Sequence, residues 1–186
     1  DELFRLPDVR NDRFGRLLSE AGWIVGAVAA VGLFAVLASF SSADPAFSHS
    51  AGPTGVQNVG GRFGAWVADI ALLQFGVCAY LLVLGLAVTV VRGFRKLHRT
   101  ASGDPLNDDL PAYAHGIGFV LLLFGAVGLE ALRFHSHGIA LPDVPGGIIG
   151  HGVAQFLRAD VGFTGATVIM LVAIAIGLSL FLDFSW

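Results

Sequence analysis

Charged residues are scarce in this chain of 186 residues, since Asp, Glu, Lys and Arg make up only 13% of it. A soluble domain carries about 25% charged residues, and here 55% of the residues are hydrophobic. Too little polar surface remains to face water, so the composition indicates an integral membrane protein. A net charge of -3 gives no overall basic character for binding nucleic acid. The single cysteine, Cys78, excludes a disulfide within the chain.

Residues that carry chemistry are also few. The one lysine, Lys96, has no glycine-rich loop around it, so the chain contains no nucleotide-binding P-loop. The only close histidine pair, His135 and His137, lies on a loop with a spacing that is poor for zinc. His115 lies near one end of an apolar run with no second histidine at membrane depth, which favours an interfacial histidine over a haem ligand. We therefore expect no catalytic residue, no metal site and no cofactor in this chain, which we predict is not itself an enzyme.

Four long uncharged runs lie between Glu20 and Asp44, Asp69 and Arg92, Asp109 and Glu130, and Asp160 and Asp183. A helix crosses a bilayer with roughly 20 apolar residues. The sequence therefore predicts an all-α integral membrane protein. Its four transmembrane helices should lie at about 19–40, 67–91, 112–133 and 162–183, in a domain of residues 17–186 that follows an N-terminal segment of residues 1–16.

The positions of Lys and Arg predict the orientation of these spans. The N-terminal segment and the loop after the second span hold eight of these residues, and the other two loops hold three. We therefore predict that both termini are cytoplasmic. Asp1 stands where a methionine would be expected, so we expect that an N-terminal piece precedes it. No secretory signal is visible.

Two shorter helices are predicted beside the spans. The run at 145–160 is too short to cross, and its apolar residues fall on one side of a helix, which predicts an interfacial or re-entrant helix before the fourth span. The N-terminal run at 11–22 predicts a short cytoplasmic helix with Asn11 or Asp12 as its cap. Its arginines would lie against anionic lipid headgroups.

Asp69 and Glu130 are the charged residues closest to the hydrocarbon. Intramembrane carboxylates are functional candidates by default, because burying them costs several kcal/mol. Both lie at the outer ends of their spans, and Glu130 has Arg133 as an i,i+3 partner. This placement favours ion pairs or interfacial anchors over a proton path. The density of glycine, 25 in all, favours close packing or self-association of helices.

The stretch "SFSSADPAFSHS" connects the first two spans, and its residues resemble those of a known family. A Ser-Phe-x-x-x-Asp-Pro-x-x-Ser step is followed by Asn-x-x-Gly-x-x-Gly-Ala-Trp-x-Ala-Asp, and "GGIIG" precedes the last span. In this order they resemble the N-terminal membrane domain of the FtsK/SpoIIIE DNA translocases, of the Gram-negative type. The resemblance runs from about Leu17 to Trp186. Our candidate structural or interaction residues are Asp44, Pro45, Asn58, Gly61, Gly64, Trp66, Asp69 and Glu130.

The local physics agrees with this assignment. Asp44-Pro45 favours an extended or turn conformation, which we expect to stop the first helix. The glycines at 60, 61 and 64 permit a close turn back into the membrane. Trp66 would lie at the outer interface, where indole is favoured.

The resemblance implies a membrane anchor and septum-targeting module of a translocase that couples chromosome segregation to cell division. Implied partners are membrane lipids, divisome proteins and further copies of the chain, as a hexamer in the full-length family. DNA and ATP would be engaged only through a motor domain absent from this chain. The implied location is the bacterial inner membrane at the division septum.

Two alternatives remain open. A DNA-conducting pore would need a polar or basic face along a span. A small transporter or a respiratory-complex subunit would need a mid-membrane cluster of charges or histidines.

Overall fold

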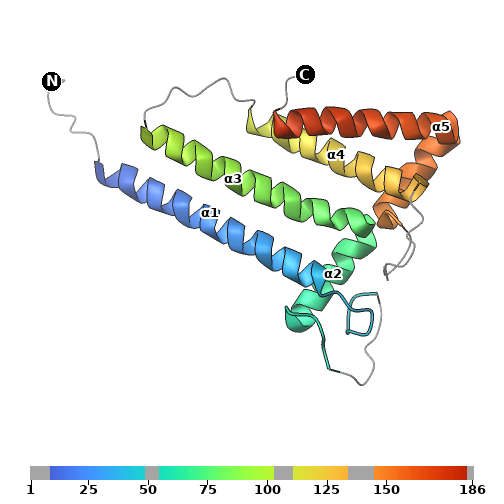
Figure 1. Ribbon diagram of the computed structural model, residues 1–186, viewed down its shortest axis with the longest axis horizontal. Coiled ribbons are helices and arrows are strands. Elements are labelled where there is room, and N and C mark those ends of the chain that lie inside the picture. Colours follow the sequence, from blue (N-terminus) through green and yellow to red (C-terminus); the bar gives the residue numbers. More distant parts are fainter. Residues whose placement is uncertain (1–8, 49–54, 103–110, 134–144, 184–186) are drawn as a thin grey trace.

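The computed structural model describes residues 9–48, 55–102, 111–133 and 145–183, and this part of the chain contains helices and connecting segments without strands (Figure 1). The helices are α1 (Val9–Ala38), α2 (Gly61–Phe75), the short 3-10 turn η1 (Gly76–Ala79), α3 (Tyr80–Ser102), α4 (Ala112–Arg133) and α5 (Gly147–Leu182). Four stretches are long and apolar enough to cross a membrane: Leu17–Ala38, Gly61–Leu97, Ala112–Arg133 and Gly147–Leu182. The prediction of an all-α protein with four spans is confirmed. Residues His135 and His137 lie outside the described part.

The helices form two hairpins, in which α1 lies beside α3 and α4 lies beside α5 (Figure 1). The first residues of α1 and α4 and the last residues of α3 and α5 lie at one end of the molecule, which we call the terminal end. The loop after α1, helix α2 and the first half of α5 lie at the other end, which we call the loop end. Each hairpin therefore leaves the terminal end and returns to it, as an even number of spans requires.

Helix α1 starts earlier than expected and runs without a break. The sequence predicts a separate short helix capped by Asn11 or Asp12, but α1 already begins at Val9 and continues to Ala38. The prediction of a separate helix is wrong. No proline interrupts residues 9–38, so the hydrogen-bonded ladder propagates from the polar segment into the apolar one.

The second predicted span, 67–91, is divided into two helices. Gly76 has a φ of 58°, a left-handed backbone conformation that glycine adopts readily. Helix α2 therefore ends at Phe75, and α3 leaves in a new direction after η1 (Figure 1). A bare hydropathy pattern cannot show this bend, because residues on both sides of it are apolar.

Helix α5 bends in the same manner. Its interior residue Gly162 has a φ of 69° and a ψ of 176°, and this bend separates a first half, 147–161, from the last span. The predicted helix before the fourth span is present in the described structure. Its buried residues are Gly147, Gly150 and Ala154, with Val153 and Leu157 half-buried against the core, while Ile148 and Phe156 are exposed.

The two hairpins share a sequence pattern at the loop end. At one constant offset, residues of α2, of its N-cap and of η1 have identical counterparts in α5 and its N-cap. The pairs are Gly60 and Gly146, Gly61 and Gly147, Gly64 and Gly150, Val67 and Val153, Ala68 and Ala154, and Gly76 and Gly162. The backbone follows the same pattern, because Gly61 and Gly147 as well as Gly76 and Gly162 have positive φ. The same series of elements therefore occurs twice in the chain: a turn, a short helix, a glycine bend and a span.

Glycines set the distance between α4 and α5. A Cβ atom added to Gly118 would lie 2.6 Å from the backbone nitrogen of Phe181. One added to Gly125 would lie 2.9 Å from the carbonyl oxygen of Met170. Both distances are too short for a real side chain, so α4 and α5 approach as closely as their backbones allow. The prediction of close helix packing from glycine density is thus located in this hairpin.

Candidate functional site

Buried polar side chains gather at the loop end, in two clusters that hold the chain where its helices end. The first cluster surrounds the end of α1. Asn58 is 5% exposed, and its amide nitrogen donates to the carbonyl oxygens of Val36 at 2.9 Å and Ser39 at 3.3 Å. The Val36 carbonyl belongs to the last turn of α1, where no intrahelical donor is available, and Ser39 directly follows that helix. Asn58, which lies just before α2, therefore caps the C-terminal end of α1.

The same amide also turns the chain into α2. Its side-chain oxygen accepts from the backbone N–H of Gly60 at 2.9 Å. A Cβ atom on Gly64 would overlap that oxygen, and Gly61 has a φ of 62°. The expected glycine turn is confirmed here, and its reason is the space that Asn58 occupies.

Asp44 fixes the loop on the other side of Asn58. Its carboxylate is 1% exposed and accepts from the backbone N–H groups of Gln57 at 2.7 Å and Asn58 at 2.8 Å. The sequence predicts that the Asp44-Pro45 step stops the first helix, and this is wrong, because α1 already ends at Ala38. Asp44 instead joins the two ends of the connector, and two charge-assisted bonds offset the burial of its charge.

Asp69 of α2 has no exposed surface. One carboxylate oxygen accepts from the backbone N–H of Ser48 and the other from the Ser48 hydroxyl, both at 2.7 Å. The carboxylate therefore ties the loop after α1 to α2. This is the geometry that a structural anchor requires.

The second cluster lies at the bend after α2. Glu130 of α4 is 6% exposed, and its two oxygens accept from the backbone N–H groups of Val77 at 3.0 Å and Cys78 at 3.1 Å. The bend leaves these two donors without the carbonyl partners of a continuous helix. A negative charge at the start of a helix is also favoured by the helix dipole. Glu130 thus links the second hairpin to the bend of the first.

Glycines let this contact form. A Cβ atom on Gly76 would lie 2.6 Å from the backbone nitrogen of Gly146 and 2.7 Å from a Glu130 oxygen. The predicted partner of Glu130, Arg133, lies elsewhere: its guanidinium stacks over the Phe163 ring, 4.7 Å from the centroid. Among the described residues no ion pair joins Glu130 and Arg133, so that expectation is wrong. The partners of Glu130 are instead the N–H groups of Val77 and Cys78 at the bend.

Large apolar side chains are exposed around the first cluster. They are Phe47, Val59, Phe63 and Trp66, of which Phe63 is 77% exposed and Trp66 47%. The rings of Phe47 and Trp66 meet edge to face, with 6.3 Å between their centroids. We call these four residues the outer aromatic face. The hydrogen bonds of Asp69 to Ser48 and of Asn58 to Gly60 hold the backbone on both sides of it.

The described clusters offer no group arranged for catalysis. Asp44, Asn58, Asp69 and Glu130 all use their oxygens to accept hydrogen bonds from the chain itself. No group of three or more His, Cys, Asp or Glu residues suited to a metal occurs within the described ranges. Pro45 is half-buried beside Asp44. The arrangement holds helices in place, and it presents a surface.

Sequence reasoning missed the partners of these side chains. Ser39 accepts from the backbone N–H of Val59 at 3.1 Å and donates to Ala35 at 2.7 Å. The N–H groups of Val77 and Cys78 carry no sequence signal at all. Ser39 and Ser48 do belong to the family-like motif, and that membership was the available signal for them.

Comparison with known proteins identifies the family to which this chain is similar. Residues 15–186 match the family described as the 4TM region of DNA translocase FtsK/SpoIIIE. The chain is 39% identical to "DNA translocase FtsK 2" of Ralstonia nicotianae over 97% of its length, and 33% identical to "DNA translocase FtsK" of Pseudomonas putida over 87%. It covers 23% and 19% of those proteins, respectively. No solved structure matches.

Proposed function

The chain belongs to the family of the 4TM region of FtsK/SpoIIIE DNA translocases, and from this premise we propose that it places a DNA translocase at the division septum. Its coarser role is that of a membrane anchor in the bacterial inner membrane, in keeping with its four apolar helices. The chain spans about a quarter or less of the relatives it matches. We propose that translocation of DNA is the work of other parts of such a protein.

The observation that carries the proposal is the match of 97% of this chain to the N-terminal part of a translocase. A tethered motor has a high effective concentration wherever its anchor resides. Coupling to division then requires only that the anchor collect at the septum. Both termini would face the cytoplasm, where ATP and DNA are found, which agrees with the excess of Lys and Arg at the terminal end.

The outer aromatic face supports a contact with other division proteins. Three aromatic side chains and one further apolar side chain protrude at the loop end, and aromatic residues are enriched at protein interfaces. Divisome proteins with membrane spans and outer domains are partners of suitable chemistry. Further copies of the chain are the second proposed class of partner, since the family resemblance implies a hexamer for the full-length protein.

A localisation experiment tests the proposal. The chain is fused at its C-terminus to a fluorescent protein and produced in dividing Gram-negative cells that retain their own translocase. We expect a fluorescent band at the constriction and resistance of the fusion to alkaline carbonate extraction. Uniform fluorescence around the whole inner membrane would contradict septal placement and leave anchoring intact. Extraction by carbonate would contradict the anchor itself.

A Phe63→Ala/Trp66→Ala variant examines the outer aromatic face. Its matched control is Leu17→Ala/Leu18→Ala, which removes two exposed apolar side chains at the terminal end of α1. We expect the first variant to lose the septal band and the second to keep it.

A further inference from the structure

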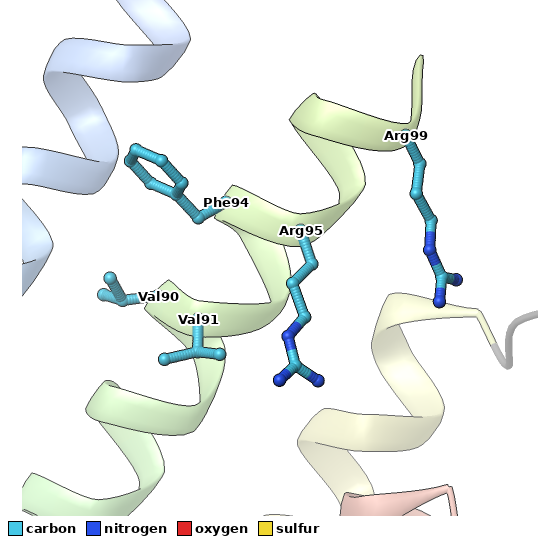
Figure 2. A pocket seen from close by; sticks show the side chains of 5 residues that line it. All are labelled: Val90, Val91, Phe94, Arg95 and Arg99. Carbon is cyan, nitrogen blue, oxygen red and sulfur yellow. The ribbon is translucent and has the colours of Figure 1, made fainter. Parts of the chain in front are cut away.

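An open cavity lies along α3 towards the terminal end. It has a volume of about 660 Å³ and is lined by Val90, Val91, Phe94, Arg95 and Arg99, all from the last turns of α3. Across from this lining in Figure 2 is α4, towards which both arginine side chains project. A cavity of this size is within the range of small-molecule sites. Its lining is apolar at one end and cationic at the other.

The order of these residues along α3 produces that division. Val91, Arg95 and Arg99 follow one another at four-residue spacing, so they form one stripe on the helix surface. Each step advances roughly 6 Å along the axis. The guanidinium groups therefore lie beyond the valines, on the side away from the membrane centre, and Phe94 borders the same cavity.

The arginines of α3 serve two different purposes. Arg92 lies over the Phe181 ring of α5, 5.3 Å from its centroid, and so joins the two hairpins. Arg95 and Arg99 have neither an ion pair nor a hydrogen bond to any described residue, and both are exposed. Two cationic groups with five donors each are thus aimed at a space that no described side chain fills.

We propose that this cavity binds an anionic phospholipid, with its phosphate on Arg95 and Arg99 and its acyl chains along Val90, Val91 and Phe94. Guanidinium groups bind phosphate oxygens in a bidentate manner. Basic pockets between transmembrane helices suit anionic headgroups, and the apolar lining directly below suits the first methylenes of the chains. The proposal deepens the anchor function and rests on it: the bound lipid would wedge between the hairpins.

Native mass spectrometry tests the site. The full chain, purified in detergent, is equilibrated with phosphatidylglycerol or with phosphatidylcholine, and the retained lipid is measured. We expect the wild type to prefer phosphatidylglycerol, and Arg95→Gln/Arg99→Gln to weaken its binding roughly 10- to 30-fold, because each basic residue contributes about fivefold. The matched control, Arg62→Gln/Arg158→Gln, removes two exposed arginines at the loop end and should bind as the wild type does.

A charge-preserving variant separates the site from the fold. Arg95→Lys/Arg99→Lys retains both positive charges and should recover most of the preference. Circular dichroism and carbonate extraction of every variant report helix content and insertion. A wild type that is extracted by carbonate would contradict the anchor function. Loss of lipid preference in a variant that stays inserted concerns the lipid site alone, and supports it.

Three results would overturn the proposal. The wild type could retain both lipids equally, or the Arg→Gln variant could bind phosphatidylglycerol as tightly as its control. A short DNA duplex could bind through the same two arginines in place of the lipid, which would make the cavity a nucleic-acid contact. Finally, a Val91→Cys variant could crosslink to a second copy in membranes, which would make this surface an interface between chains.

Discussion

The Oε1 atom of Glu130 in α4 accepts a hydrogen bond of 3.0 Å from the backbone N–H of Val77, the first residue after the Gly76 bend. The two residues lie in different hairpins, and this bond and its neighbour to Cys78 are the polar link between them at the loop end. The carboxylate replaces the carbonyl partners that a continuous helix would have supplied. The bend therefore frees two N–H groups that need an acceptor, and these N–H groups in turn stabilise the buried carboxylate of Glu130.

Substitution of Glu130 tests this link. We expect Glu130→Ala to lower the free energy of unfolding in detergent by about 3 kcal/mol, because the N–H groups of two half-buried residues lose a charged acceptor. Glu130→Gln keeps one acceptor oxygen and should lose about half as much. Thermal unfolding followed by circular dichroism measures both. Equal stability of the wild type and Glu130→Ala would mean that water or lipid satisfies the bend without this side chain.

The two glycine bends differ in what surrounds them, which gives a second prediction. At Gly76, alanine would suffer both an unfavourable φ of 58° and a close approach to Gly146. At Gly162, with a φ of 69°, the space around an added Cβ is open. We expect Gly162→Ala to destabilise by about 1–3 kcal/mol, because its φ of 69° and ψ of 176° fall in a region that is nearly confined to glycine. Gly76→Ala should destabilise by about 1–3 kcal/mol more than that, because the added Cβ also clashes. Similar melting temperatures for the two variants would contradict this account.

Asn58 and Gln57 offer a matched pair in the loop. Asn58 uses its side chain to cap α1, whereas Gln57 contributes only its backbone N–H to Asp44. We expect Asn58→Ala to destabilise by about 2–4 kcal/mol, since the helix carbonyls and the Gly60 N–H lose their partner. Gln57→Ala should change stability by less than about 0.5 kcal/mol. Urea unfolding monitored by tryptophan fluorescence compares them, and a reversed order would refute the cap.

Gly116 and Gly118 are matched within α4. A Cβ on Gly118 would strike the backbone of Phe181, while one on Gly116 would meet nothing within 4 Å. Gly118→Ala should therefore separate α4 from α5 and destabilise by about 1–3 kcal/mol. Gly116→Ala should be neutral, or stabilising by up to about 1 kcal/mol through helix propensity. If Gly118→Ala were equally well tolerated in a melting experiment, the close approach of the two helices would be absent.

The orientation of the spans is open to chemical labelling. In a Cys78→Ser background, Val59→Cys at the loop end should react with an impermeant maleimide added to spheroplasts. Thr100→Cys at the terminal end should react only after permeabilisation. This pattern follows from the excess of Lys and Arg at the terminal end. Immediate labelling at position 100 together with protection at position 59 would reverse the orientation.

Much of the fold was available from the sequence alone. The scarcity of charge and the four apolar runs determine the membrane class and the number and order of spans, because a bilayer admits few ways to satisfy the backbone. The ordered motif around Asp44, Asn58 and Asp69 determines the family. The family motif depends on residues that are close together in the chain. The number of spans depends on the lipid environment that all of the spans share.

Only the tertiary structure decided what the buried polar residues do. Asp69 meets Ser48, and Glu130 meets Val77 and Cys78, across sequence separations that no local pattern reports. Hydropathy also could not place the bend at Gly76. The residues on both sides of it are apolar, and they would be equally favoured in the membrane whether the helix continued or turned. A helix end needs hydrogen-bond partners from wherever the fold supplies them, and that supply is settled only when the two hairpins pack together.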